Sequence, residues 1–213
     1  MLGTALLTAG VCFWSGTSPA RAQQARPDDE QSNDRDAERA LVFLAGGATA
    51  LGAHEGGHLV LDYAFDARPG VKRVDFGIVP FFAITHRPVS RRKEFAIASA
   101  GFWVQHAINE WLLTTRPGLR RERAAFEKGM LAFNVLASFA YSGAALAHAG
   151  PLERDTRGMA LALGPRGVDE RWIGVLVLTP AALDAYRYFA PDRAWAKWAS
   201  RAAKVGMVLL VIR

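Results

Sequence analysis

Four predominantly apolar segments are separated by polar stretches along the 213-residue chain. They cover approximately residues 40–63, 95–113, 128–149 and 172–189. Each is close to the ~20 residues that an α-helix needs to cross a bilayer. The pattern therefore predicts a mainly α-helical fold, arranged as a polytopic membrane bundle.

Two further patterns complete the expected elements. Residues 195–212 carry Lys197, Arg201 and Lys204 three or four positions apart, which predicts an amphipathic helix lying at the membrane interface. Between the first two helices, residues 71–85 alternate between apolar and polar side chains, which predicts a short β-hairpin or small sheet.

The N-terminal region resembles a targeting segment followed by a spacer. Residues 1–22 contain an apolar stretch and end in Ala-Arg-Ala, which is typical of a secretory signal peptide, although the segment could also remain as an N-terminal anchor. Residues 23–39 are polar and predict a flexible tether outside the cytoplasm. We expect a membrane core over residues 40–160 and C-terminal helices over residues 161–213.

Polar side chains inside the apolar segments leave a second architecture open. In a membrane they would have to face the interior of the bundle, whereas a soluble or peripheral helical protein would hold them without constraint. The mean hydropathy of +0.07 permits either arrangement. The residues concerned are Gln105, His106, Asn109, Glu110, Asn134 and Ser138.

Composition and charge narrow the classes of partner. The only cysteine, Cys12, lies in the predicted signal segment, which excludes structural disulfides and cysteine-ligated zinc. The net charge is +6, and the basic residues form short clusters between apolar segments. This distribution favours loops facing anionic lipid headgroups over a nucleic-acid surface. The aromatic residues near the end of the chain, Tyr186, Tyr188, Trp195 and Trp198, are typical of a membrane boundary.

The sequence His54-Glu55-Gly56-Gly57-His58 is the motif with the clearest chemistry. Residues four apart on a helix share one face, so both imidazoles can reach a single Zn²⁺ ion. Glu55 can then accept a proton from a water molecule that zinc has activated. The two glycines lower helix propensity by ~1 kcal/mol each, which predicts close approach of another chain segment or of a substrate.

A catalytic zinc site commonly takes a third protein ligand. The candidates are His86, His106, Glu110, His148 and Asp155. If the tether lies outside, the first helix ends inside near His58 and the third helix also ends inside, shortly before Asp155. His106 and Glu110 would lie at a different depth, which favours Asp155.

These features resemble the site-2 protease family of intramembrane zinc metalloproteases. The resemblance covers about residues 40–160 and includes the helix with His54 and His58, the strand-like segment 71–85, and the small residues 96–101 that end in glycine. Asn134 resembles an asparagine that precedes the family's aspartate ligand. The chain departs from the family at Arg154-Asp155-Thr156, where the family has Leu-Asp-Gly.

The resemblance implies a zinc-dependent protease in a bacterial-type inner or cell membrane. Its substrates would be membrane or membrane-proximal proteins or peptides, whose backbone would pair with the edge of the small sheet. Asn134, His148, His106 and Glu110 are possible auxiliary residues of the site. His106 and Glu110 could instead form a buried polar pair, and His148 could cap its helix. Arg154 and Arg157 could hold the Asp155 carboxylate or a substrate carbonyl, or could lie on the surface.

Two other functions remain open at this point. One is a non-catalytic helical membrane protein that keeps a metal or polar cluster for structure or interaction. The other is a soluble zinc protease with a helical core.

Overall fold

The computed structural model describes residues 27–76, 79–164 and 166–212. The elements follow in the order α1 (Pro27–Ala64), β1 (Gly70–Phe76), β2 (Val79–Thr85), α2 (Arg91–Thr115), the 3-10 helix η1 (Leu119–Arg121), α3 (Ala125–Ala147), α4 (Asp155–Ala162), α5 (Glu170–Phe189) and α6 (Ala194–Ile212).

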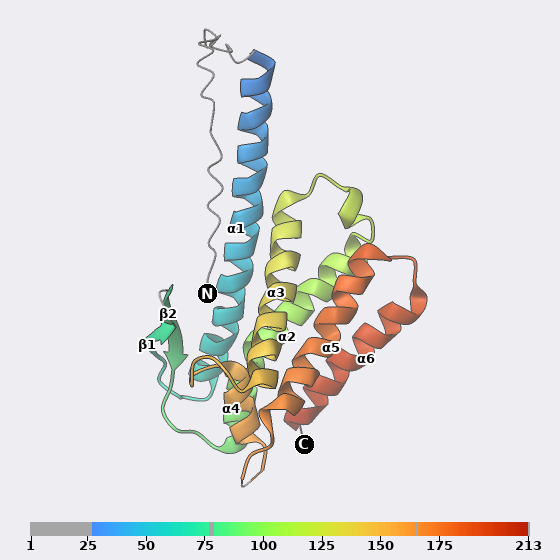
Figure 1. The fold of residues 1–213 in the computed structure, drawn as a ribbon. Helices are drawn as coiled ribbons and strands as arrows, with labels where there is room; N and C mark the ends of the chain where they lie inside the picture. Colours follow the sequence, from blue (N-terminus) through green and yellow to red (C-terminus); the bar gives the residue numbers. More distant parts are fainter. Residues whose placement is uncertain (1–26, 77–78, 165, 213) are drawn as a thin grey trace, which may run out of the picture.

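The mainly helical class and the small hairpin are confirmed. β1 and β2 form a two-stranded antiparallel sheet, with Gly70 paired to Thr85 and Phe76 paired to Val79. The hairpin lies beside the C-terminal end of α1, away from α5 and α6 (Figure 1). The four long apolar segments correspond to α1, α2, α3 and α5.

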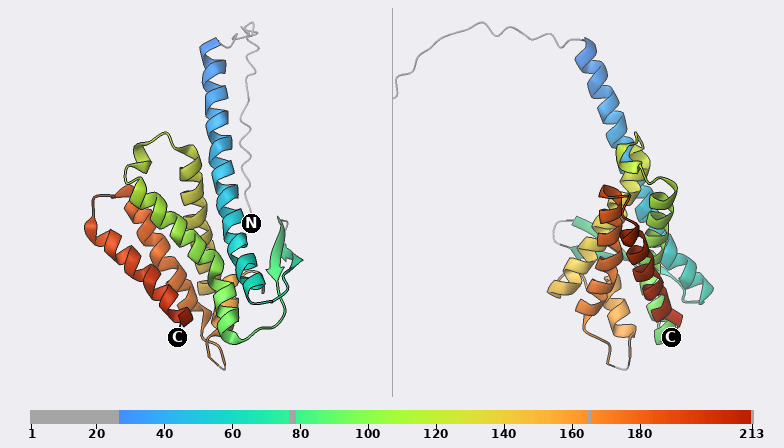
Figure 2. Two further views of the ribbon diagram at one scale, coloured as in Figure 1. Left: turned by 180° about the vertical axis from the view of Figure 1, so that it is seen from behind. Right: turned by 90° about the vertical axis from the view of Figure 1, so that its right-hand side faces the viewer.

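Helix α1 is longer than expected, because it begins at Pro27 rather than near residue 40. The part predicted as a flexible tether is therefore helical from Pro27 onward, and it projects beyond the other helices (Figure 2). Ala37, Glu38, Arg39 and Ala40 have high helix propensity and continue directly into the apolar segment, so nothing interrupts the helix. The predicted signal segment, residues 1–22, lies outside the described residues.

Glycines allow α1 and α3 to cross at very close range. A Cβ atom at Gly46 would lie 2.0 Å from the carbonyl oxygen of Phe126, and one at Gly129 would lie 1.9 Å from that of Phe43. Only glycine permits this approach of two backbones. Small residues at helix crossings are a common device in membrane bundles, where dispersion contacts replace the hydrophobic effect.

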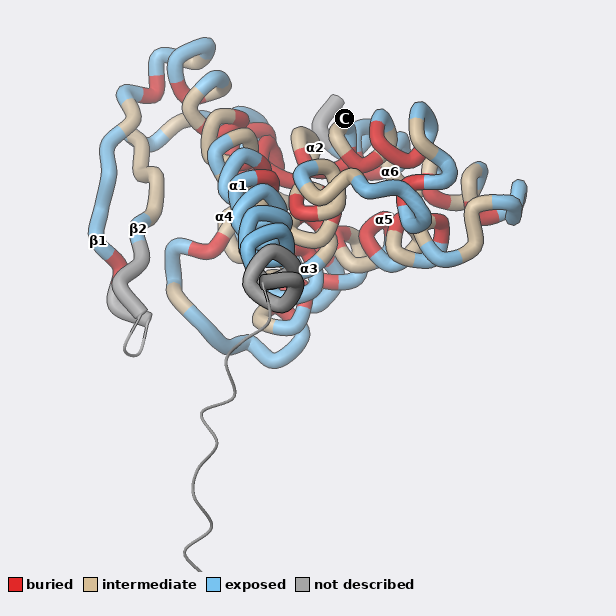
Figure 3. Tube along the Cα trace, turned by 90° about the horizontal axis from the view of Figure 1, so that it is seen from above, coloured by how far each residue is buried: buried red, intermediate tan, exposed pale blue. Residues whose placement is uncertain are grey.

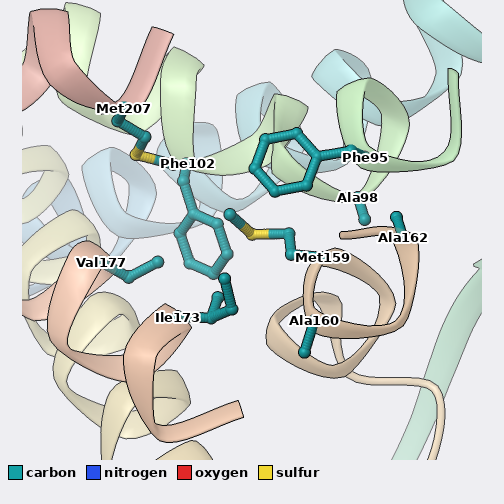
Figure 4. Packing of buried hydrophobic residues seen from close by; sticks show 9 residues of the cluster. All are labelled: Phe95, Ala98, Phe102, Met159, Ala160, Ala162, Ile173, Val177 and Met207. Atoms are coloured by element: carbon teal, nitrogen blue, oxygen red, sulfur yellow. The ribbon is translucent and has the colours of Figure 1, made fainter. Parts of the chain in front are cut away.

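The apolar core lies where α2, α4, α5 and α6 meet (Figure 4). Phe102 from α2 and Met159 from α4 are fully buried and point toward one another. Ile173 and Val177 from α5, with Met207 from α6, complete the cluster. This packing fixes α4, a short helix that the sequence patterns did not predict, against the long helices.

Two basic residues of α6 bind carboxylates of α2 and α5. Arg201 and Lys204 lie 2.8 and 3.0 Å from carboxylate oxygens of Glu110, and Lys204 also lies 2.8 Å from Asp184. Asp184 is fully buried, and a buried carboxylate requires a cationic partner. The position of α6 at a membrane interface stays a prediction.

Among the described residues, α3 is the one helix that is long and apolar enough to cross a membrane. In α1 and α2, ionisable and amide side chains stand among the apolar residues. Many of these polar side chains are buried inside the bundle. Figure 3 shows buried positions on the helix faces that meet, while residues 34–45 of α1 are exposed.

We expect Gly129→Ala to destabilise the protein by about 1–3 kcal/mol, because the added methyl group would force α1 and α3 apart. Gly143→Ala is the matched control on the same helix, since a Cβ atom there meets nothing within 4 Å. Thermal unfolding in detergent measures both. A melting temperature that falls equally in the two variants would contradict the close crossing.

Candidate metal centre

His54 and His58 lie on one face of α1, near its C-terminal end. Both are buried, and their ring centroids are 5.0 Å apart. The Nε2 atoms of the two rings approach to 3.2 Å. The spacing of four residues thus brings the two imidazoles together as the sequence predicted.

Asp155, the first residue of α4, completes the group. Its Oδ2 atom lies 3.1 Å from Nε2 of His54 and 3.4 Å from Nε2 of His58. The three ligand atoms all lie within 4.8 Å of one another, which is a geometry that could hold a metal ion. The structure thus brings the predicted third ligand to the histidine pair, across 101 positions of sequence from His54.

A hydrogen bond to the backbone of α2 determines which nitrogen of His58 carries a proton. Nδ1 of His58 lies 2.8 Å from the carbonyl oxygen of Ile97, which can only accept, so Nδ1 carries the proton. In the neutral ring, Nε2 then presents its lone pair toward Asp155 and His54. A positive charge at this position, either a proton on an imidazole or a metal ion, compensates the charge of the Asp155 carboxylate. A carbonyl on the outer nitrogen is also the usual partner of a metal-binding histidine.

The three distances fit tetrahedral zinc. Bonds of about 2.0–2.1 Å to the corners of a tetrahedron place neighbouring ligand atoms about 3.3 Å apart. The observed separations of 3.1, 3.2 and 3.4 Å match that edge length. Two imidazoles and one carboxylate are also a donor set that zinc uses in catalytic sites.

Small residues in α2 make room for this arrangement. A Cβ atom at Gly101 would lie 2.3–2.5 Å from three atoms of the His54 ring, so only glycine fits there. On α1, a Cβ atom at Gly57 would lie 3.0 Å from the carbonyl oxygen of Ala100 on α2. The close approach predicted for the glycines of the motif is therefore made by α2 at Gly57, whereas Gly56 faces open space.

Residues on either side of Asp155 fix the start of α4. Arg154 is buried and grips Glu170, the first residue of α5, with Nε 2.6 Å from Oε1 and NH2 bonded to Oε2. Thr156 donates to the same carboxylate at 2.7 Å. Arg154 therefore holds Glu170 rather than the Asp155 carboxylate, and this ion pair ties the start of α4 to the start of α5.

The charge state of Asp155 suits a cation ligand. Burial alone would raise the pKa of its carboxyl, but the adjacent His58 and His54 rings outweigh burial and hold that pKa below its ordinary value. Asp155 is thus ionised and available as an anionic ligand.

Glu55 follows His54 on α1 and is half-buried. His54, His58 and Asp155 all influence its carboxyl group electrostatically. Among the described residues, none of the hydrogen bonds in this structure involves the Glu55 carboxylate.

His106 and Glu110 lie in a different cluster, formed by α2, α5 and α6. Glu110 accepts hydrogen bonds from Arg187, Arg201 and Lys204. His106 is buried, and within the described part of the chain neither of its ring nitrogens has a hydrogen-bond partner. The two residues do not join the histidine pair of α1.

The three remaining candidate residues have partners away from the His54, His58 and Asp155 group. His86 lies 3.6 Å from Glu94, and His148 lies 3.3 Å from Asp169 in a left-handed conformation that ends α3. Asn134 donates to Asn109 at 2.9 Å rather than to a residue of the centre. None of the three contacts the His54, His58 and Asp155 group through a hydrogen bond or ion pair described in this structure.

Tyr141 is a neighbour of the centre that the sequence patterns did not indicate. It lies on α3, stacks on the ring of His54 and meets the ring of Phe102 edge to face. Its position seven residues after Asn134 places it near the same face of α3. The helical periodicity of α3 was the only feature of the sequence that could have placed Tyr141 near this group.

Searches of protein-family models, of curated proteins and of solved structures found no match to this chain.

We expect Gly101→Ala to weaken zinc binding at least tenfold, because the new methyl group would displace the His54 ring. Gly206→Ala in α6 is the control, since a Cβ atom there meets nothing within 4 Å. Competition with a chromophoric chelator measures both affinities. Equal affinity of Gly101→Ala and the control would show that His54 does not bind the metal in this orientation.

Proposed function

We propose that the protein is a membrane-embedded, zinc-dependent metalloprotease. The observation that carries the proposal is the convergence of His54, His58 and Asp155. The carboxylate of Glu55, the residue after His54, interacts electrostatically with all three. This set supplies three metal ligands and one proton acceptor. The resemblance of residues 40–160 to the site-2 protease family agrees with it.

The reaction would be hydrolysis of a peptide bond. Bound zinc would lower the pKa of a water molecule and polarise the carbonyl under attack. Glu55 would accept the proton as the water oxygen attacks the carbonyl carbon, and would pass that proton to the amine as the C–N bond breaks. His54, His58 and Asp155 would keep their ligand atoms fixed throughout.

The distribution of polar and apolar side chains supports a site inside a bilayer. On α3, Asn134 and Ser138 are fully buried, while Leu136 and Phe139 are 67% and 42% exposed. On α2, Asn109 is buried and Trp111 is exposed. Large apolar side chains exposed on the same helices that bury amides and hydroxyl groups suit a surface covered by lipid. We therefore propose that α1, α2 and α5 accompany α3 in the cell membrane.

The hairpin offers a place for an extended substrate. Within the described residues, the sheet has only two strands, so β1 and β2 each have one unpaired edge. A peptide could add to such an edge through backbone hydrogen bonds. The hairpin follows directly after the helix that carries His54 and His58, which favours membrane or membrane-proximal proteins as substrates.

We expect Glu55→Gln to keep zinc and to lose peptidase activity by at least about 10²-fold, because the amide cannot accept the proton. The assay would use purified full-length protein in liposomes with a set of fluorogenic single-span peptides. Glu38→Gln, at the exposed other end of α1, is the control and should behave as wild type. Wild-type protein that binds zinc but cleaves none of the peptides faster than Glu55→Gln would favour a structural metal site.

We also expect the protein to remain in the membrane pellet after washing at alkaline pH, because large apolar side chains are exposed on its long helices. Fractionation of cells followed by immunodetection measures this. Recovery in the aqueous fraction would contradict membrane embedding, and would favour a soluble zinc protease.

A further inference from the structure

The two histidines of the metal centre are oriented in different ways. Nδ1 of His58 lies 2.8 Å from the carbonyl oxygen of Ile97. Nδ1 of His54 is buried, and within the described part of the chain it has no hydrogen-bond partner. Metal-binding histidines usually have such a partner on the outer nitrogen, which fixes the orientation of the ring. The orientation of the His54 ring therefore depends on packing.

Aromatic rings from two helices pack on His54. The ring of Tyr141, from α3, lies nearly parallel to the His54 ring, with centroids 6.0 Å apart and an interplanar angle of 25°. The ring of Phe102, from α2, meets the His54 ring edge to face at 5.6 Å and 85°. Aromatic pairs prefer these two arrangements, so each contact restricts rotation of the imidazole about its side-chain bonds.

The apolar core holds Tyr141 itself in place. Phe102 meets Tyr141 edge to face, with centroids 5.2 Å apart and an interplanar angle of 89°. Phe102 is fully buried in the core formed by α2, α4, α5 and α6 (Figure 4), and Tyr141 packs against the same core. Because protein cores are close-packed, the ring of Tyr141 cannot turn without displacing its neighbours. Tyr141 thus connects the core to the His54 imidazole.

We infer that Tyr141 is a positioning residue of the metal centre, whose ring holds the His54 imidazole in the plane in which Nε2 faces His58 and Asp155. Stacking at His54 takes the place of the hydrogen bond that orients His58. The inference rests on the proposed zinc site and adds a residue to it. Partners that orient a ligand without touching the metal commonly contribute about 10–100-fold to metal affinity.

The test compares Tyr141→Leu with Tyr141→Phe in the full chain, purified in detergent. We expect zinc affinity, measured by competition with a chelator, to fall about 10–100-fold in Tyr141→Leu, because the stacked ring is lost. Tyr141→Phe keeps that ring, so its zinc affinity should stay within about threefold of wild type. The visible spectrum of the Co²⁺-loaded protein should change in Tyr141→Leu and not in Tyr141→Phe, because it depends on the arrangement of the ligands.

Tyr188→Leu is the matched control for loss of a packed tyrosine ring. Tyr188 lies on α5, is half-buried against the cluster that contains Leu112, and meets Phe189 edge to face at 5.1 Å. It should lower the melting temperature of the metal-free protein about as much as Tyr141→Leu does, and leave zinc affinity unchanged. An equal loss of zinc affinity in Tyr188→Leu would show a general effect of destabilisation and would overturn the inference.

The other outcomes separate the possible failures. Unchanged zinc affinity and Co²⁺ spectrum in Tyr141→Leu would overturn the inference, and so would a loss in Tyr141→Phe as large as that in Tyr141→Leu, because the hydroxyl group and not the ring would then matter. Wild-type protein that binds no zinc would defeat the proposed function and this inference with it, whereas tight wild-type binding without an effect of Tyr141→Leu would defeat only the role of Tyr141.

A second variant covers the case in which Tyr141→Leu does not fold. Tyr141→Met also removes the ring, and its flexible side chain adapts to the space that the ring leaves. We expect the same loss of zinc affinity in Tyr141→Met, and unchanged affinity with an unchanged Co²⁺ spectrum would overturn the inference.

Discussion

Convergence of two imidazoles on one carboxylate is the constraint around which this structure is arranged. Nε2 of His58, Nε2 of His54 and Oδ2 of Asp155 lie 3.1–3.4 Å apart, and a hydrogen bond to Ile97 places one proton of His58 on the opposite side of its ring. A carboxylate at this distance from two imidazoles needs a positive charge beside it, which a protonated imidazole or a bound metal ion can supply. Gly101 leaves space for one ring, and the ion pair of Arg154 with Glu170 holds the carboxylate end of the site.

Around this centre, the bundle keeps its polar groups inside. The interior holds amides, hydroxyl groups and a second set of charges, in which Asp184 and Glu110 bind the basic residues of α5 and α6. Several large apolar side chains lie exposed on the outside of α2 and α3, among them Trp111, Leu136 and Phe139. Each buried carboxylate in this second cluster has a cationic partner, so it fastens α6 to the bundle without a metal. The two clusters therefore have different chemistry, although both contain histidine and carboxylate.

The parts that could be predicted from sequence depend on local periodicity. The long helices follow from runs of apolar residues, the hairpin from alternation, and the pairing of His54 with His58 from the helical repeat. Asp155 could be chosen because helix direction places it at the same end of the bundle. In contrast, α4, the contact of Gly101 with His54, and the place of Tyr141 depend on packing between distant segments. The helical start of α1 was missed because its polar composition resembles that of a disordered spacer, whereas its helix propensity is high.

X-ray absorption at the zinc edge on the purified, zinc-replete protein tests the central claim most directly. The account predicts one zinc per chain with nitrogen and oxygen neighbours at about 2.0–2.1 Å, and outer-shell scattering from two imidazole rings. His58→Ala should remove the scattering of one ring. A protein that remains metal-free after zinc loading, or a zinc spectrum that His58→Ala leaves unchanged, would contradict it.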